Sequence, residues 1–181
     1  MNNQEYSGKR KLKYILFSLA ILLLIIIILL IRDFSIKQID DVTPGRFCER
    51  NLVEKSQTLM IIPLLDNISI ADNVSWCDYI LSLNKTLGMH GVYHTPNEFS
   101  YKLGEGDIRK GMEEFKKCFG FYPPIFEAPR LDLNRENEKI LREMGFEVRG
   151  YRFSIFHKVY HCVDFNKNSY LVKQNKIIEI F

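Results

Sequence analysis

An uncharged apolar segment near the N-terminus constrains this chain more than any other feature. Residues 14–31 carry no charged side chain and consist almost entirely of Leu, Ile, Phe and Ala. At about 1.5 Å per residue, a helix of this length spans roughly the ~30 Å hydrocarbon core of a bilayer when its flanking side chains snorkel. The core helix of a soluble domain normally keeps a polar stripe, which this segment lacks. We therefore predict a transmembrane anchor over residues 14–31.

The residues that flank this segment predict an uncleaved anchor and set its orientation. The apolar run exceeds the ~7–15 residues of a signal peptide, and no small-x-small cleavage site follows in Ile31-Arg32-Asp33-Phe34. Residues 1–13 form a basic tail with Lys9, Arg10, Lys11 and Lys13, whereas charges of both signs follow the segment. The positive-inside rule then predicts a single-pass membrane protein with a cytoplasmic N-terminus, lipid contact through residues 14–31 and an extracytoplasmic domain.

The remaining sequence predicts one globular domain. The chain has 181 residues, of which 46% are hydrophobic and 26% charged, enough apolar surface to form a packed core. A net charge of +3 is too small to indicate a nucleic-acid partner, and we expect none. Residues 32–57, with Asp, Lys, Pro and Gly, are predicted to be a tether, and residues 58–181 the domain.

Four cysteines fall on the side of the membrane that is oxidising in many cells: Cys48, Cys77, Cys118 and Cys162. They could form two disulfides in any of three pairings, and the sequence selects none. Free buried thiols are an equally good interpretation.

Short apolar runs alternate with amphipathic helical patterns from residue 58 to residue 151. We expect strands at 58–65, 89–93, 124–128 and 146–151, and helices at 75–87, 107–119 and 134–144 that end at Gly88, Gly120 and Gly145. This alternation predicts an α/β fold with parallel strands covered by helices. The last segment, residues 170–180, is predicted to form a closing hairpin.

Candidate metal ligands follow the predicted strands. Active sites of such folds lie at the carboxyl ends of the strands, which directs attention to Asp66, to residues 90–95 and to residues 127–130. His90 and His94 are four residues apart and could reach one ion, and a carboxylate with two imidazoles is a common ligand set. We therefore predict Asp66, His90 and His94 as metal ligands. Histidines on the surface or in helix caps are the alternative interpretation.

Several segments resemble, in order, the polysaccharide deacetylase (NodB-homology) superfamily, particularly its divergent branch of uncharacterised deacetylase-like proteins. They are Leu87-Gly-Met-His-Gly-Val-Tyr-His-Thr95, residues 111–129 ending in Phe126-Glu-Ala-Pro129, and residues 134–146, within a match over residues 58–152. The resemblance implies an irregular (β/α) barrel, which could be complete or incomplete here, since the family's usual domain is longer than the part of this chain that follows the anchor. It also implies metal-dependent removal of acetyl groups, with a divalent metal of the zinc type as cofactor and an acetylated surface or cell-wall glycan as partner.

The sequence departs from this family in its catalytic motifs. The first motif of the family has two adjacent aspartates, whereas Leu65-Asp66-Asn67 has one, and Glu127 replaces the groove arginine. We predict Asp66, Glu127 and Arg130 as catalytic residues, with Glu127 as the base and Arg130 as the positive charge. His161 is the available stand-in for the family's acid histidine, although an ordinary strand side chain is the more economical interpretation.

These departures leave three functional hypotheses. The first is a membrane-anchored, metal-dependent deacetylase. The second is a catalytically impaired deacetylase-like domain that binds glycan or a protein partner. The third is a tethered interaction protein that shares only the architecture, since fold does not imply function.

Overall fold

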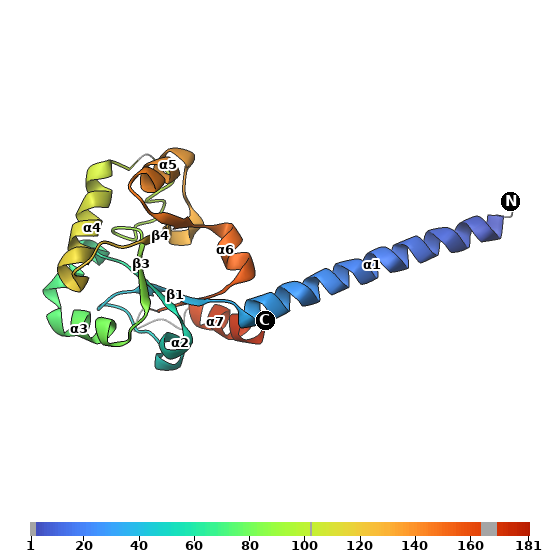
Figure 1. The fold of residues 1–181 in the computed structure, drawn as a ribbon, viewed down its shortest axis with the longest axis horizontal. Coiled ribbons are helices and arrows are strands. Elements are labelled where there is room, and N and C mark those ends of the chain that lie inside the picture. The colour runs from blue at the N-terminus through green and yellow to red at the C-terminus, as the bar shows by residue number, and fades with distance from the viewer. Residues whose placement is uncertain (1–2, 102, 164–169) are drawn as a thin grey trace.

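A computed structural model of the chain describes residues 3–101, 103–163 and 170–181, so residues 1 and 2 of the predicted basic tail lie outside it. One long helix, α1 (Asn3–Phe34), projects from a domain built around a central sheet (Figure 1). The domain contains, in chain order, β1 (Lys37–Val42), α2 (Arg50–Lys55), β2 (Thr58–Ile61), α3 (Val74–Ser82), β3 (Thr86–His90), α4 (Glu105–Phe119), β4 (Ile125–Glu127), α5 (Arg135–Glu143), β5 (Glu147–Arg149), α6 (Tyr151–Phe156), β6 (Lys158–His161) and α7 (Tyr170–Ile180). Residues Arg10–Phe34 of α1 are long and apolar enough to be a candidate membrane span.

The strands form one parallel sheet in the order β5-β4-β3-β2-β1-β6, which curls into a half-barrel with helices outside. Its outer face buries two apolar clusters. One packs the β1–β2 region against α2, α3 and α4, and the other packs β3 and β4 against α4 and α5. The predicted α/β class and irregular barrel are therefore confirmed, and in the part of the chain that the structure describes the barrel is incomplete.

The segment predicted as a tether is instead part of the sheet. β1 (Lys37–Val42) lies between β2 and β6, and only Ser35 and Ile36 separate it from α1. Ile39 and Val42 pack in the outer core, whereas Gln38 and Asp40 are buried and polar. Because β1 presents polar residues to the inside of the half-barrel, it has no apolar run, and periodicity alone does not reveal it.

Two other predictions need correction, one in the end of a helix and one in the type of an element. The helix predicted at 75–87 ends at Ser82, and Gly88 lies inside β3, where an added Cβ would be 2.6 Å from the Met60 sulfur. Gly88 therefore allows the Met60 and Ile125 side chains of the neighbouring strands to pack closely against β3, and it does not cap a helix. The C-terminal hairpin is the helix α7, while Gly120 and Gly145 follow helices with positive φ as expected.

The four cysteines form two disulfides. Cys77–Cys118 joins α3 to α4, and Cys48–Cys162 joins the loop after β1 to the residue after β6. A bridge between Phe47 and Val163 runs beside the second disulfide. The carboxyl ends of β1 and β6 are thus held together covalently.

Candidate active site

Two adjacent aspartates, Asp40 and Asp41, lie at the carboxyl end of β1 and are 2% and 4% exposed. Neighbouring side chains of a regular strand point to opposite faces. Here the register of β1 against β2 is irregular between Ile39 and Val42, and Asp41 has a left-handed φ of 65°. Aspartate tolerates this conformation better than most residues. The irregularity lets both carboxylates line one cavity.

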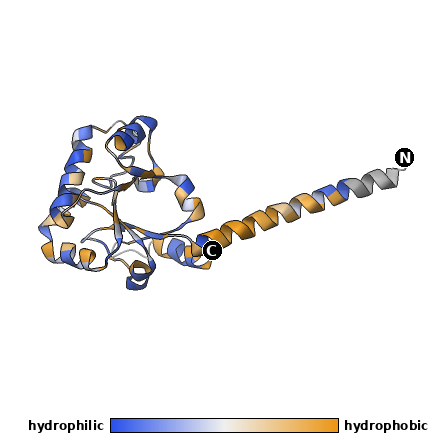
Figure 2. Cartoon of the chain, viewed as in Figure 1, coloured by the Kyte–Doolittle hydropathy of each residue, from blue (hydrophilic) through white to orange (hydrophobic). Residues whose placement is uncertain are grey.

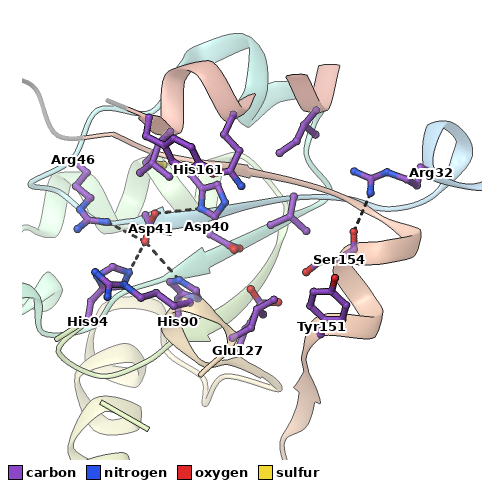
Figure 3. A pocket seen from close by; sticks show the side chains of 18 residues that line it. Arg32, Asp40, Asp41, Arg46, His90, His94, Glu127, Tyr151, Ser154 and His161 are labelled. Carbon is purple, nitrogen blue, oxygen red and sulfur yellow. Dashed lines mark hydrogen bonds and ion pairs between the residues drawn. The ribbon is translucent and has the colours of Figure 1, made fainter. Parts of the chain in front are cut away.

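Three histidines surround the Asp41 carboxylate (Figure 3). Its Oδ1 lies 2.6 Å from His94 Nε2 and 3.6 Å from His90 Nε2, and its Oδ2 lies 3.4 Å from His161 Nδ1. One ligand atom from each of Asp41, His90 and His94 falls within 4.8 Å of the others. Arg46 Nη1 also lies 3.0 Å from Asp41 Oδ1. Asp41 is thus the common partner of this cluster.

The protonation states suit a ligand cluster. Burial alone would raise the pKa of Asp41, but hydrogen bonds to His161 and His94 and the nearby imidazoles lower that pKa well below its ordinary value. Burial lowers the pKa of His90 to about 3. Asp41 is therefore ionised and His90 neutral at physiological pH, as metal ligands must be.

Glu98 shapes the loop that presents His94. Its Oε1 accepts hydrogen bonds from the backbone N–H groups of Val92 and Tyr93, and its Oε2 accepts one from that of His94, all at 2.9 Å. His94 itself has a left-handed φ of 59°, which this carboxylate helps to hold. Gly91 completes the turn because an added Cβ would be 2.7 Å from the Pro129 ring.

A second carboxylate faces Asp40 at the bottom of the cavity. Glu127, at the end of β4, is 1% exposed, and Gln38 Nε2 donates to both Asp40 Oδ1 (2.7 Å) and Glu127 Oε2 (3.1 Å). Burial and the charge of Glu127 raise the pKa of Asp40 well above its ordinary value, and burial raises the pKa of Glu127. Arg149 Nη1 donates to Gln38 Oε1 at 2.7 Å, and its nearby charge lowers the pKa of Glu127, against the effect of burial.

The structure brings most, but not all, of the predicted site together. His90, His94, Glu127 and Arg130 line one cavity of about 780 Å³. Asp66 does not: it is exposed in a turn after β2, because that strand ends at Ile61 and the chain turns away before residue 66. Asp41 takes the place in the cluster that was predicted for Asp66.

The residues that sequence reasoning missed come mainly from β1. They are Asp40, Asp41 and Gln38, with Arg149 from β5. The adjacent aspartates in Ile39-Asp40-Asp41-Val42 are the available signal, since the resemblance calls for such a pair. His161, at the end of β6, also lines the cavity, and Asn175 of α7 holds its backbone through two hydrogen bonds.

No family model and no curated protein matches the sequence, but solved structures share its fold. A CE4 family pseudoenzyme from Bacillus anthracis superposes with a TM-score of 0.53 at 13% identity, over 82% of this chain and 60% of that one. A family 4 carbohydrate esterase from Streptomyces lividans, solved with acetate, superposes with a TM-score of 0.51 at 12% identity, over 80% of this chain and 85% of that one.

The fold is therefore that of the CE4 family, the NodB-type polysaccharide deacetylases, and the resemblance read from the sequence is confirmed at that level. The chain spans less than two thirds of the Bacillus pseudoenzyme. The fold occurs both in an esterase and in a pseudoenzyme, so the question of catalysis depends on the residues of the cavity.

Proposed function

We propose that this chain is a membrane-anchored, metal-dependent deacetylase-like hydrolase that acts on an acetylated glycan. The observation that carries the proposal is the convergence of Asp40, Asp41, His90, His94 and His161 in one cavity at the carboxyl ends of the strands. The resemblance calls for two adjacent aspartates. They are absent at Asp66-Asn67 but present on β1 as Asp40 and Asp41. We further propose that α1 crosses the membrane with the domain outside, in keeping with the basic tail and the two disulfides.

The donor set of the cluster fits a divalent metal ion. Asp41, His90 and His94 supply one carboxylate and two imidazoles, which suits zinc and similar ions and leaves coordination positions for water and substrate. Arg46 lies beside the same carboxylate and partly neutralises its negative charge, which would weaken the affinity for the ion. When bound, such an ion polarises a carbonyl and acidifies water.

The remaining side chains would move the protons of the hydrolysis. In its ionised form, Asp40 would accept a proton from water. His161 would donate a proton to the departing sugar nitrogen or oxygen, so that acetate leaves and the sugar regains an amine or a hydroxyl. Glu127 and Gln38 would set the fraction of Asp40 that is ionised.

One observation favours a second candidate, a domain that binds glycan without hydrolysing it. The raised pKa of Asp40 beside buried Glu127 disfavours the ionised form that a general base needs. The structural likeness to a pseudoenzyme is compatible with this candidate. Metal-dependent acetate release would exclude it.

The decisive experiment measures metal content and acetate release with the full chain in lipid nanodiscs. We expect about one zinc-like ion per chain in the parent, and its loss in the His94→Ala and Asp41→Asn variants, because each removes a ligand. Asp66→Asn is the matched control and should retain the ion. Acetate release from acetylated chitooligosaccharide that depends on the ion would support hydrolysis, whereas equal metal content in all variants would contradict the proposed site.

A further inference from the structure

The candidate cavity has one wall at the end of the anchor helix. Its lining includes Arg32 of α1, Tyr151 and Ser154 of α6, and Tyr170 of α7. Arg32 directly follows the apolar run of residues 14–31. If α1 crosses the membrane, Arg32 lies at the level of the lipid headgroups. The cavity then borders the membrane surface.

Several contacts fix α1 against the domain at this level. Arg32 Nη1 donates to the backbone oxygens of Ser154 and Ile155 at 3.2 and 3.4 Å, and Ser35 Oγ donates to that of Phe156 at 2.8 Å. Lys158 Nζ lies 3.1 Å from Asp33 Oδ1. With two residues between α1 and β1, the domain has no linker by which to move away from the bilayer.

The surface around the junction suits a membrane interface. Large apolar and aromatic side chains are exposed there: Phe34, Tyr151, Phe156 and Tyr170. Figure 2 shows that α1 remains apolar down to its junction with the domain. Aromatic side chains are enriched at the headgroup level of membranes, where the apolar part of the ring faces the lipid tails and a polar group, such as the tyrosine hydroxyl, faces water. The wall of the cavity at the end of α1 therefore carries groups that suit lipid headgroups.

Charged side chains line opposite sides of the cavity. Arg32 lies at one side in Figure 3, and the Asp41 cluster lies at the other. Arg32 Nε is buried and has no hydrogen-bond partner among the described residues. Guanidinium groups bind phosphate in a planar, bidentate manner. A ligand with phosphate near Arg32 would place a sugar beyond it, toward the histidines.

We propose that the substrate is an acetylated sugar attached through phosphate to a membrane lipid, rather than a wall polymer. The lipid tail would stay in the bilayer, the phosphate would meet Arg32, and the sugar would enter the cavity of about 780 Å³. This inference rests on the proposed function, because it names the substrate of that same cavity.

The test uses the full chain in phosphatidylcholine nanodiscs and a photoreactive dialkylglyceryl phospho-N-acetylglucosamine. We expect labelling of residues 30–36, 151–156 and 170–178. The unlabelled lipid should displace the probe at a concentration at least tenfold lower than N-acetylglucosamine 1-phosphate does. Arg32→Gln should lower the labelling at least tenfold and Arg32→Lys less, because lysine keeps the charge.

A pair of exposed tyrosines provides the matched control. Tyr170→Ser removes a side chain of the cavity wall and should weaken labelling, whereas Tyr79→Ser on α3, outside the cavity lining, should not. Equal displacement by the soluble sugar phosphate, or labelling that neither Arg32→Gln nor Tyr170→Ser alters, would overturn the lipid-linked substrate.

Acetate release separates this inference from the proposed function. Metal-dependent release from soluble chitooligosaccharide as fast as from the lipid-linked sugar would support hydrolysis and overturn the lipid substrate. Selective labelling by the lipid probe without any acetate release would support the lipid ligand and overturn hydrolysis.

Discussion

Glu127 faces Asp40 where the family resemblance calls for an arginine, and this exchange reverses the charge beside the candidate base. An arginine would stabilise the ionised form of Asp40, whereas Glu127 raises its pKa. Arg149 offers partial compensation through Gln38. The balance between hydrolysis and simple binding thus depends on one buried carboxylate.

Replacing that carboxylate by an amide should increase activity. In Glu127→Gln the burial of Asp40 still raises its pKa, but the added effect of the Glu127 charge is gone, so more Asp40 is ionised at pH 7. We expect faster acetate release, by up to roughly tenfold for each unit by which the pKa of Asp40 falls. Initial rates at constant metal content would measure the effect. Glu143→Gln, on the exposed face of α5, is the control, and an unchanged or lower rate in Glu127→Gln would argue against Asp40 as the base.

Glu98 should matter for metal affinity although it contacts no ion. Glu98→Gln replaces one of two acceptor oxygens by an NH₂ group, which cannot accept the N–H groups of residues 92–94. We expect the metal affinity to fall about 10- to 100-fold because His94 is held less firmly. Competition with a chelator would measure the change. Glu105→Gln, which loses only an exposed pair with Arg109, should bind the ion as the parent does.

At the scale of elements, β1 is the strand on which the site depends and also the one that the sequence pattern hides. Apolar runs revealed β2 to β5, because those strands contribute to the outer core. In β1 the inward positions are Gln38 and Asp40, so its composition resembles that of a linker. Histidine spacing pointed to His90 and His94, which lie beside Asp41 in the cavity, whereas the carboxylate was expected after β2 because β1 was not recognised. The pairing of β1 with β2 and β6 makes residues 37–42 a strand and brings Asp41 to the histidines, and hydrophobic periodicity does not encode such pairing.

Gly88 illustrates the same limit and can be tested. A Cβ atom added at Gly88 in β3 would lie 2.6 Å from the Met60 sulfur and 3.1 Å from Ile125 Cβ. Gly88→Ala should therefore lower the unfolding free energy by about 1–3 kcal/mol through overpacking. Gly106→Ala is the matched control: it meets no atom within 4 Å in α4 and should raise stability by up to about 1 kcal/mol. Denaturant titration of both variants in detergent would measure this, and equal stability would refute the packing role.

At the scale of the whole molecule, the helix, the disulfides and the cavity agree on one arrangement. A basic tail precedes α1, and both disulfides lie beyond it, in the domain. The likeness to CE4 structures covers the domain fold, and the anchor is a feature that the composition of residues 14–31 already predicts. From these features we expect the cavity to lie outside the cytoplasm.

Epitope tags can test this orientation. We expect a tag after Phe181 to bind antibody on intact cells and a tag before Met1 to bind only after permeabilisation, because positive charge is retained inside. Immunofluorescence with and without detergent measures both. The reverse pattern would exclude an extracytoplasmic glycan as substrate.

The short connection between α1 and β1 has a further consequence. Many anchored ectodomains are released when a protease cuts an exposed stalk, but here the two residues between helix and strand include Ser35, whose side chain is bonded to α6. Shedding would have to break the contacts that join α1 to the domain. If α1 anchors the chain as we propose, the domain stays at the membrane surface and acts only on targets that are present there.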